Sequence, residues 1–150
     1  MNINIKNQII MFVIMIITGM LFNPMNVLAY RLNDLYFSLT LFYGGLLMAS
    51  NMLWAHEIYH YFSMNHFNLQ IFMIGLSLSI FISIFLLRKQ FLISDRQWLR
   101  RMISHHSTAL TTSHKIYKNT KNKKIKKISK DIINTQEKEI SIMKQLLEKK

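Results

Sequence analysis

The sequence predicts an all-α protein of three transmembrane helices followed by an antiparallel two-helix hairpin. One Pro and four Gly in 150 residues leave few helix breakers. Charge also divides the chain, because residues 1–87 sum to zero while residues 88–150 carry seventeen Lys and Arg against five Asp and Glu. An apolar first part and a basic second part exclude a single water-soluble domain. We therefore expect a membrane region at residues 1–90 and a helical hairpin domain at residues 91–150.

Three apolar stretches account for the predicted membrane region. Residues 9–30, 35–55 and 69–87 are uncharged, and each approaches or reaches the roughly 20 residues that cross a bilayer. The third stretch is followed by Arg88 and Lys89, a basic pair that is typical of the end of a span.

The first apolar stretch has two interpretations. Lys6, the apolar run that follows it and the small residue Ala29 are typical of a signal peptide with its cleavage point. In that case residues 1–29 are removed, and Pro24 ends the helix before the cut. Otherwise the stretch is a retained span, and Pro24 kinks it.

The basic part of the chain predicts two amphipathic helices. Ser94 and Gln97 form a capping box that starts a helix from about Asp95 to Tyr117. A turn at residues 118–123 leads to a second helix from about Lys124 to Leu147, and so short a connection makes the two helices antiparallel neighbours. At 100° per residue, one face of the second helix contains Ile125, Ile128, Ile132, Gln136, Glu139, Met143 and Leu146.

Polar residues interrupt the apolar faces of both helices at the same level of the hairpin. Imidazole, carboxylate and thioether groups that converge in this way are typical of a transition-metal site. Thioethers in a chain without cysteine favour Cu(I), whereas His and Glu alone also suit Zn or Fe. The alternative is a metal-free network in which His106 donates to Glu139. The candidate ligands are Met102, His105, His106, Gln136, Glu139 and Met143.

These residues also carry a resemblance to a known family. Residues 101–110 (RMISHHSTAL) and 132–143 (IINTQEKEISIM) resemble the domain-of-unknown-function-305 family, over about residues 91–148. Residues 35–40 and 43–48 are similar to the second span of its membrane-anchored branch. The resemblance implies a ferritin-like helical fold, and copper or silver binding through Met and His at the six positions above. Two departures are Ser104, where many members have Pro, and Thr111-Thr112, where soluble members often have Met.

A second stripe of possible metal ligands lies on the predicted second span. Met48, Met52, His56 and His60 recur at every fourth residue and so share one helix face, although Met at this spacing is also ordinary packing. His56-Glu57-Ile58-Tyr59-His60 matches the helix motif of zinc metalloproteases. Since no third ligand or substrate cleft is evident, we interpret the match as chance and expect no enzyme.

Two functions remain open at this point. One is a multi-pass membrane protein whose small helical domain binds a transition metal such as copper. The alternative is a metal-free, membrane-anchored interaction or assembly module. Expected partners are the lipid bilayer and a second copy, since two paired hairpins form a four-helix bundle. Six lysines between Lys121 and Lys130 suit lipid headgroups or solvent, and no nucleic acid is expected.

The side of the membrane that holds the hairpin stays open. Basic residues near the span ends favour the cytoplasm, whereas the resemblance points to an exported domain.

Overall fold

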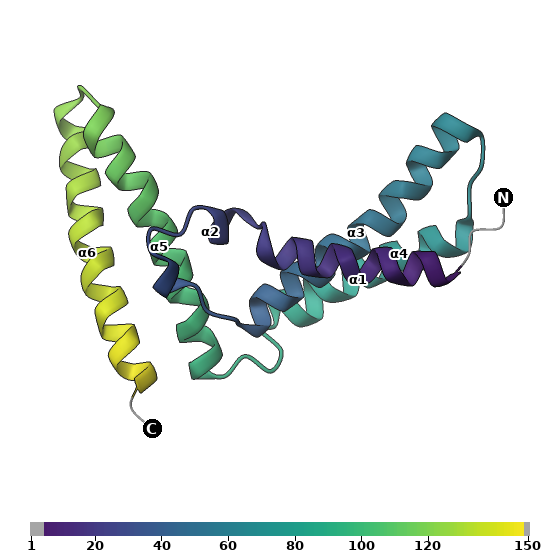
Figure 1. The fold of residues 1–150 in the computed structure, drawn as a ribbon, viewed down its shortest axis with the longest axis horizontal. Helices are drawn as coiled ribbons and strands as arrows, with labels where there is room; N and C mark the ends of the chain where they lie inside the picture. Colours follow the sequence, from purple (N-terminus) through teal and green to yellow (C-terminus); the bar gives the residue numbers. More distant parts are fainter. Residues whose placement is uncertain (1–4, 149–150) are drawn as a thin grey trace. The chain divides into compact units, whose positions relative to one another are not determined.

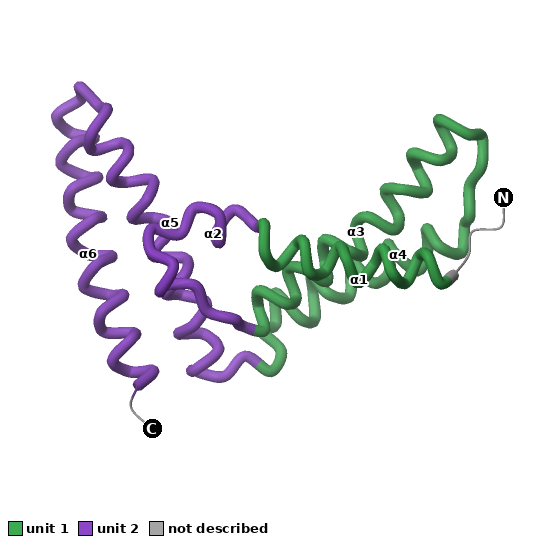
Figure 2. The backbone as a smooth tube through the Cα atoms, in the orientation of Figure 1, with its two compact units in different colours: residues 1–22, 39–92 green, residues 23–38, 93–150 purple. Residues whose placement is uncertain are grey.

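The computed structural model describes residues 5–148 and is helical, with no β-strand among them, which confirms the predicted all-α class. Two compact units divide the chain (Figure 2): unit 1 comprises residues 1–22 and 39–92, and unit 2 comprises residues 23–38 and 93–150. In chain order the elements (Figure 1) are α1 (Ile5–Leu21), α2 (Pro24–Val27), the 3₁₀ turn η1 (Leu32–Asp34), α3 (Leu39–Met64), α4 (Leu69–Phe81), the π-helical segment η2 (Ile82–Arg88), α5 (Asp95–Asn119) and α6 (Lys123–Glu148).

Unit 1 is a bundle of α1, α3 and α4 in which the helix backbones touch at glycines. Within this unit α1 and α4 run in one direction and α3 runs in the other (Figure 1). A Cβ atom at Gly45 of α3 would lie 2.7 Å from the carbonyl oxygen of Ile16. One at Gly75 of α4 would lie 2.9 Å from the backbone nitrogen of Trp54. Such close contacts at small residues are typical of helices that pack in membranes.

Among the described residues, two helical segments are long and apolar enough to cross a membrane: Lys6–Val27 and Leu69–Arg88. The prediction of three such spans is therefore wrong in number, because α3 does not qualify. Its helix begins at Leu39 and ends at Met64, so it is shifted toward the C-terminus relative to the predicted span at 35–55. The shift brings in polar residues that lower its hydropathy, among them His56, Glu57 and His60.

The apolar helix is interrupted just before Pro24, for which the sequence left a helix end and a kink as alternatives. Helix α1 ends at Leu21, and Pro24 occupies the first position of α2. The side chain of Asn23 caps α2 by accepting hydrogen bonds from the backbone nitrogens of Met25 and Asn26, at 3.0 and 3.1 Å. Pro24 is suited to this first position because its missing N–H would have no helical partner there.

In unit 2, α5 and α6 form the predicted antiparallel hairpin. Their bounds lie within two residues of the expected ones. Ser94 accepts from the backbone nitrogen of Gln97 at 3.5 Å, as the capping box requires. Asn122 begins α6 by accepting from the backbone nitrogens of Lys124 and Ile125.

The buried face of α6 differs from the predicted one. Ser129, Ile140 and Met143 are its buried residues, whereas much of the predicted apolar face is exposed. The centre of the buried face is turned by roughly 50° from the predicted one, at 100° per residue. The reason is a third element, since residues 23–38 pack in unit 2 on the side of α6 that carries Glu137 and Lys144. The predicted boundary at residue 90 therefore does not separate residues 23–38 from the hairpin.

Candidate functional site

Three of the six predicted hairpin ligands lie together. Nδ1 of His106 on α5 is 3.0 Å from Oε2 of Glu139 on α6. Nε2 of Gln136 lies 3.5 Å from the same carboxylate oxygen. The side chain of His106 is 13% exposed and that of Glu139 is 44% exposed, so the pair lies at the edge of the hairpin interior with one side open to solvent.

The other three predicted ligands have different surroundings. Met143 is buried in the apolar core of the hairpin, and Met102 packs partly buried against that core. His105 is exposed, and its ring lies edge-on to that of His106 with 5.9 Å between the centroids. The remaining core residues are Ile103, Leu110 and Ile140. The two methionines therefore belong to the apolar core, while the imidazoles lie toward the hairpin surface.

The environment of His106 favours its neutral form. Burial lowers the pKa of this imidazole from its ordinary value of 6.5, and the charge of His105 adds to the effect. The carboxylate of Glu139 opposes the shift but does not reverse it. Nδ1 of His106 is buried and lies close to the carboxylate, although the two groups are not aligned for a hydrogen bond.

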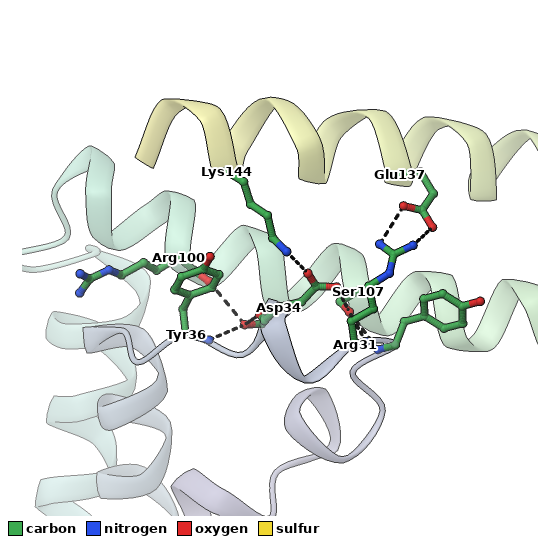
Figure 3. A network of polar contacts seen from close by, with 9 residues as sticks. Arg31, Asp34, Tyr36, Arg100, Ser107, Glu137 and Lys144 are labelled. Carbon is green, nitrogen blue, oxygen red and sulfur yellow. Dashed lines mark hydrogen bonds and ion pairs between the residues drawn. The ribbon is translucent and has the colours of Figure 1, made fainter. Parts of the chain in front are cut away.

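Residues 30–36 are held on the hairpin by a polar network that the sequence did not reveal, here called the clasp (Figure 3). Its centre is Asp34, which is fully buried. Nζ of Lys144 on α6 lies 2.6 Å from Oδ1 of Asp34, and Oγ of Ser107 on α5 donates to Oδ2 at 2.7 Å. The same hydroxyl accepts from the backbone nitrogen of Tyr30 at 2.9 Å. One carboxylate thus connects three segments.

Further contacts of the clasp lie on both helices. Arg31 donates two hydrogen bonds to the carboxylate of Glu137, at 2.9 and 2.6 Å, and these bonds raise the pKa of its guanidinium (Figure 3). Ser104 donates to the backbone oxygen of Asp34 at 2.8 Å. Thr108 donates to the backbone oxygen of Met25 at 3.0 Å. Hydroxyl residues that recur at helical spacing along α5 are the signal that could have predicted a polar partner for this face.

A second polar cluster lies near the end of α3 in unit 1, and we call it the turn cluster: His56, Glu57 and His60. One potential ligand atom from each residue lies within 4.8 Å of the other two. The rings of the two histidines have their centroids 4.0 Å apart. The predicted stripe placed Met48 and Met52 with these histidines, but Met48 lies against α1, where a Cβ atom at Gly19 would be 2.9 Å from its sulfur.

Glu57 of the turn cluster is fully buried. Its Oε2 atom accepts a hydrogen bond from the backbone nitrogen of Asn68 at 2.8 Å, which ties the end of α3 to the start of α4. Its Oε1 atom is buried without a hydrogen-bond partner. The sequence motif alone did not predict this burial, because it depends on the turn that follows α3.

Comparisons with known proteins place the chain in a family. The family model of the domain of unknown function DUF305 matches residues 88–147. An uncharacterized protein of Acanthamoeba polyphaga mimivirus is 31% identical over 146 residues, which is 97% of this chain and 94% of the mimivirus protein. Residues 88–147 thus match the DUF305 model, and over nearly its whole length the chain belongs to the same family as the mimivirus protein. No solved structure matches it.

The mimivirus similarity covers more of the chain than the DUF305 match does. The DUF305 match covers α5 and most of α6, and so includes the contact between His106 and Glu139. The turn cluster lies outside it. The similarity to the mimivirus protein extends over nearly the whole chain, so it includes the apolar helices of unit 1.

Proposed function

We propose that this DUF305 chain is a membrane-anchored assembly module whose α5–α6 hairpin pairs with the hairpin of a second copy. One observation carries the proposal: α6 exposes a row of apolar side chains although the hairpin core is already filled by others. We call this row the apolar stripe. Its residues, which are 37–59% exposed, are Ile125, Ile128, Ile132, Ile142 and Leu146.

The two long apolar helices support the membrane anchor. Only 6% of the apolar window in Lys6–Val27 and 17% of that in Leu69–Arg88 is buried within the protein, so most of their apolar surface is left to lipid. These two helices therefore form the membrane anchor of the proposed module.

The charge distribution along α6 supports an antiparallel partner. Residues 123–130 contain five lysines and no acid, whereas residues 137–148 contain three acids and two lysines. Parallel pairing of two α6 helices would place their two lysine-rich ends together, and antiparallel pairing keeps these ends apart. In the antiparallel register Ile125 of one copy lies beside Leu146 of the other. Two paired hairpins form a four-helix bundle, the ferritin-like arrangement that the family resemblance implies.

Energy transfer between labelled copies of the full chain in liposomes tests this proposal. The chain has no cysteine, so Lys130→Cys provides a single labelling site on an exposed part of α6. We expect transfer for the otherwise unchanged chain and its loss in Ile128→Lys/Ile132→Lys. The matched control is Asn134→Lys/Gln145→Lys, which adds the same two charges on the other side of α6 and should keep the transfer. Equal transfer in both double variants would refute pairing through the apolar stripe.

Transition-metal binding by the hairpin is the second candidate function, and the contact between His106 and Glu139 favours it. A carboxylate beside one imidazole nitrogen orients the ring and leaves the other nitrogen for a metal. The exposed His105 is the nearest further imidazole donor. Nitrogen and oxygen donors suit Cu(II) or Zn, whereas Cu(I) would also require the thioethers of the core. Stoichiometric metal uptake that is abolished by His105→Ala/His106→Ala would support this function, and equal uptake by that variant would exclude it.

A further inference from the structure

The turn cluster is a group of potential metal ligands in unit 1, separate from the hairpin. Residues at positions i, i+1 and i+4 of a helix lie within about 100° of arc, so their side chains can reach one point beside the helix. His56, Glu57 and His60 have this spacing, and their ligand atoms lie within 4.8 Å of one another. The spacing alone does not separate a ligand site from ordinary packing, so a second observation is needed.

The burial of Glu57 supplies that observation. Its carboxylate has no exposed surface, and its Oε1 atom has no hydrogen-bond partner. The ion pairs of Arg31, His106 and Lys144 do not involve Glu57. A buried carboxylate without a compensating positive charge is strongly unfavourable. A cation bound at Oε1 would remove this cost.

We propose that the turn cluster binds one divalent transition-metal ion of the zinc class, with His56, Glu57 and His60 as ligands. Two imidazoles and one carboxylate are suited to such an ion, whereas calcium and magnesium prefer oxygen ligands alone. Two imidazoles bound to one zinc have centroids about 5 Å apart, from Zn–N bonds near 2.1 Å and a tetrahedral angle. The rings of His56 and His60, at 4.0 Å, therefore need to move apart by about 1 Å to bind one ion. The ring of His66 lies 6.5 Å from that of His60, so it is outside the proposed ligand set.

The role of the ion is structural, because Glu57 is not free to act as a base. In the zinc metalloprotease motif the histidines bind the metal and the glutamate activates water. Here one oxygen of Glu57 accepts from the backbone of Asn68, and the other is the proposed metal ligand. Asn68 also caps α4 by accepting from the backbone nitrogens of Gln70 and Ile71. The ion therefore fixes the turn that joins α3 to α4.

Zinc binding by the full chain in detergent tests the proposal. The protein carries an affinity tag without histidine, is dialysed against EDTA, and is titrated with Zn²⁺ in competition with a chromophoric chelator. We expect one high-affinity zinc per chain, weakened at least 100-fold in His56→Ala/His60→Ala and about 10-fold or more in Glu57→Gln. The control His105→Ala/His106→Ala should keep this site. The absence of bound zinc, or equal affinity in all four proteins, would overturn the proposal.

Hydrogen exchange provides a second measurement that does not depend on the total metal content. Free zinc at about ten times the wild-type dissociation constant should slow amide exchange at residues 61–68 of the wild-type chain about tenfold and that in Glu57→Gln about twofold or less. Glu57→Gln retains the size of the side chain and an oxygen that can accept from Asn68, so it is the variant that preserves the local fold best. Equal slowing of exchange in both proteins would place the zinc elsewhere and overturn the assignment.

Discussion

Replacement of Lys144 by Met should open the clasp, because it leaves the carboxylate of Asp34 buried without its cation. Nζ of Lys144 lies 2.6 Å from Oδ1 of Asp34, which is fully buried. Removal of one partner from a buried ion pair costs about 3–5 kcal/mol. The lower end, about 3 kcal/mol, is expected here because the Lys144 side chain is 28% exposed and Ser107 still donates to the carboxylate. That corresponds to a change of roughly 100-fold in the opening equilibrium.

Hydrogen exchange of the full chain in detergent measures this opening directly. Amides of residues 30–38 should exchange about 100-fold faster in Lys144→Met than in the wild type. The control Glu137→Gln removes the exposed pair with Arg31, whose side chains are 35–45% exposed, and should accelerate exchange less than about fivefold.

A double variant separates the buried charge from other effects of the substitution. Asp34→Asn/Lys144→Met has no buried charge, and its neutral amide can still bond to Ser107. Its exchange should be slower than that of Lys144→Met alone. The reasoning would be refuted if Lys144→Met exchanged no faster than Glu137→Gln, or if the double variant exchanged as fast as Lys144→Met.

Three further predictions concern single residues. Gly45→Ala should destabilise unit 1, because its Cβ would lie 2.7 Å from a backbone oxygen. The control Gly44→Ala has nothing within 4 Å of its Cβ and should be neutral or stabilising. Thermal unfolding in detergent compares the two variants, and equal melting temperatures would contradict the close helix contact. The pKa of His106 is lowered, so its protonation favours unfolding, and hairpin stability should fall as the pH drops below 6.5. His106→Gln should flatten that dependence, and an unchanged slope from pH 7 to 5 would contradict it. Ser107→Ala should weaken the clasp by about 1.5–3 kcal/mol through the lost bond to a carboxylate, and unchanged exchange at residues 30–38 would argue against this.

The helices were predictable from the sequence because their ends are determined locally. Ser94 and Asn122 cap α5 and α6, and Pro24 marks the break after α1. The count of spans failed at α3, where an apolar first half concealed a polar second half. The face of α6 was misplaced because its orientation depends on residues 23–38, which are distant in sequence and fell mostly within the first two predicted spans.

The candidate sites were predictable to a different extent. Helical spacing and the antiparallel hairpin sufficed to bring His106 and Glu139 together. The same reasoning did not separate Met102 and Met143 from that contact, because helical spacing does not show that Met143 is buried in the apolar core and Met102 packs against it. The turn cluster was visible as a motif, but the burial of Glu57 depends on tertiary contacts with the turn after α3.

Crosslinking at the predicted two-fold axis tests the pairing of the hairpins most directly. In an antiparallel pair of α6 helices that matches Ile125 with Leu146, residues near 135 meet their own counterparts. Thr135→Cys in the full chain, reconstituted in liposomes and treated with a short bismaleimide, should therefore yield a covalent dimer. Lys130→Cys should yield little, because its two copies lie about 16 Å apart along the helix axis at 1.5 Å per residue. A Thr135→Cys chain that crosslinks no better than Lys130→Cys would contradict the proposed assembly.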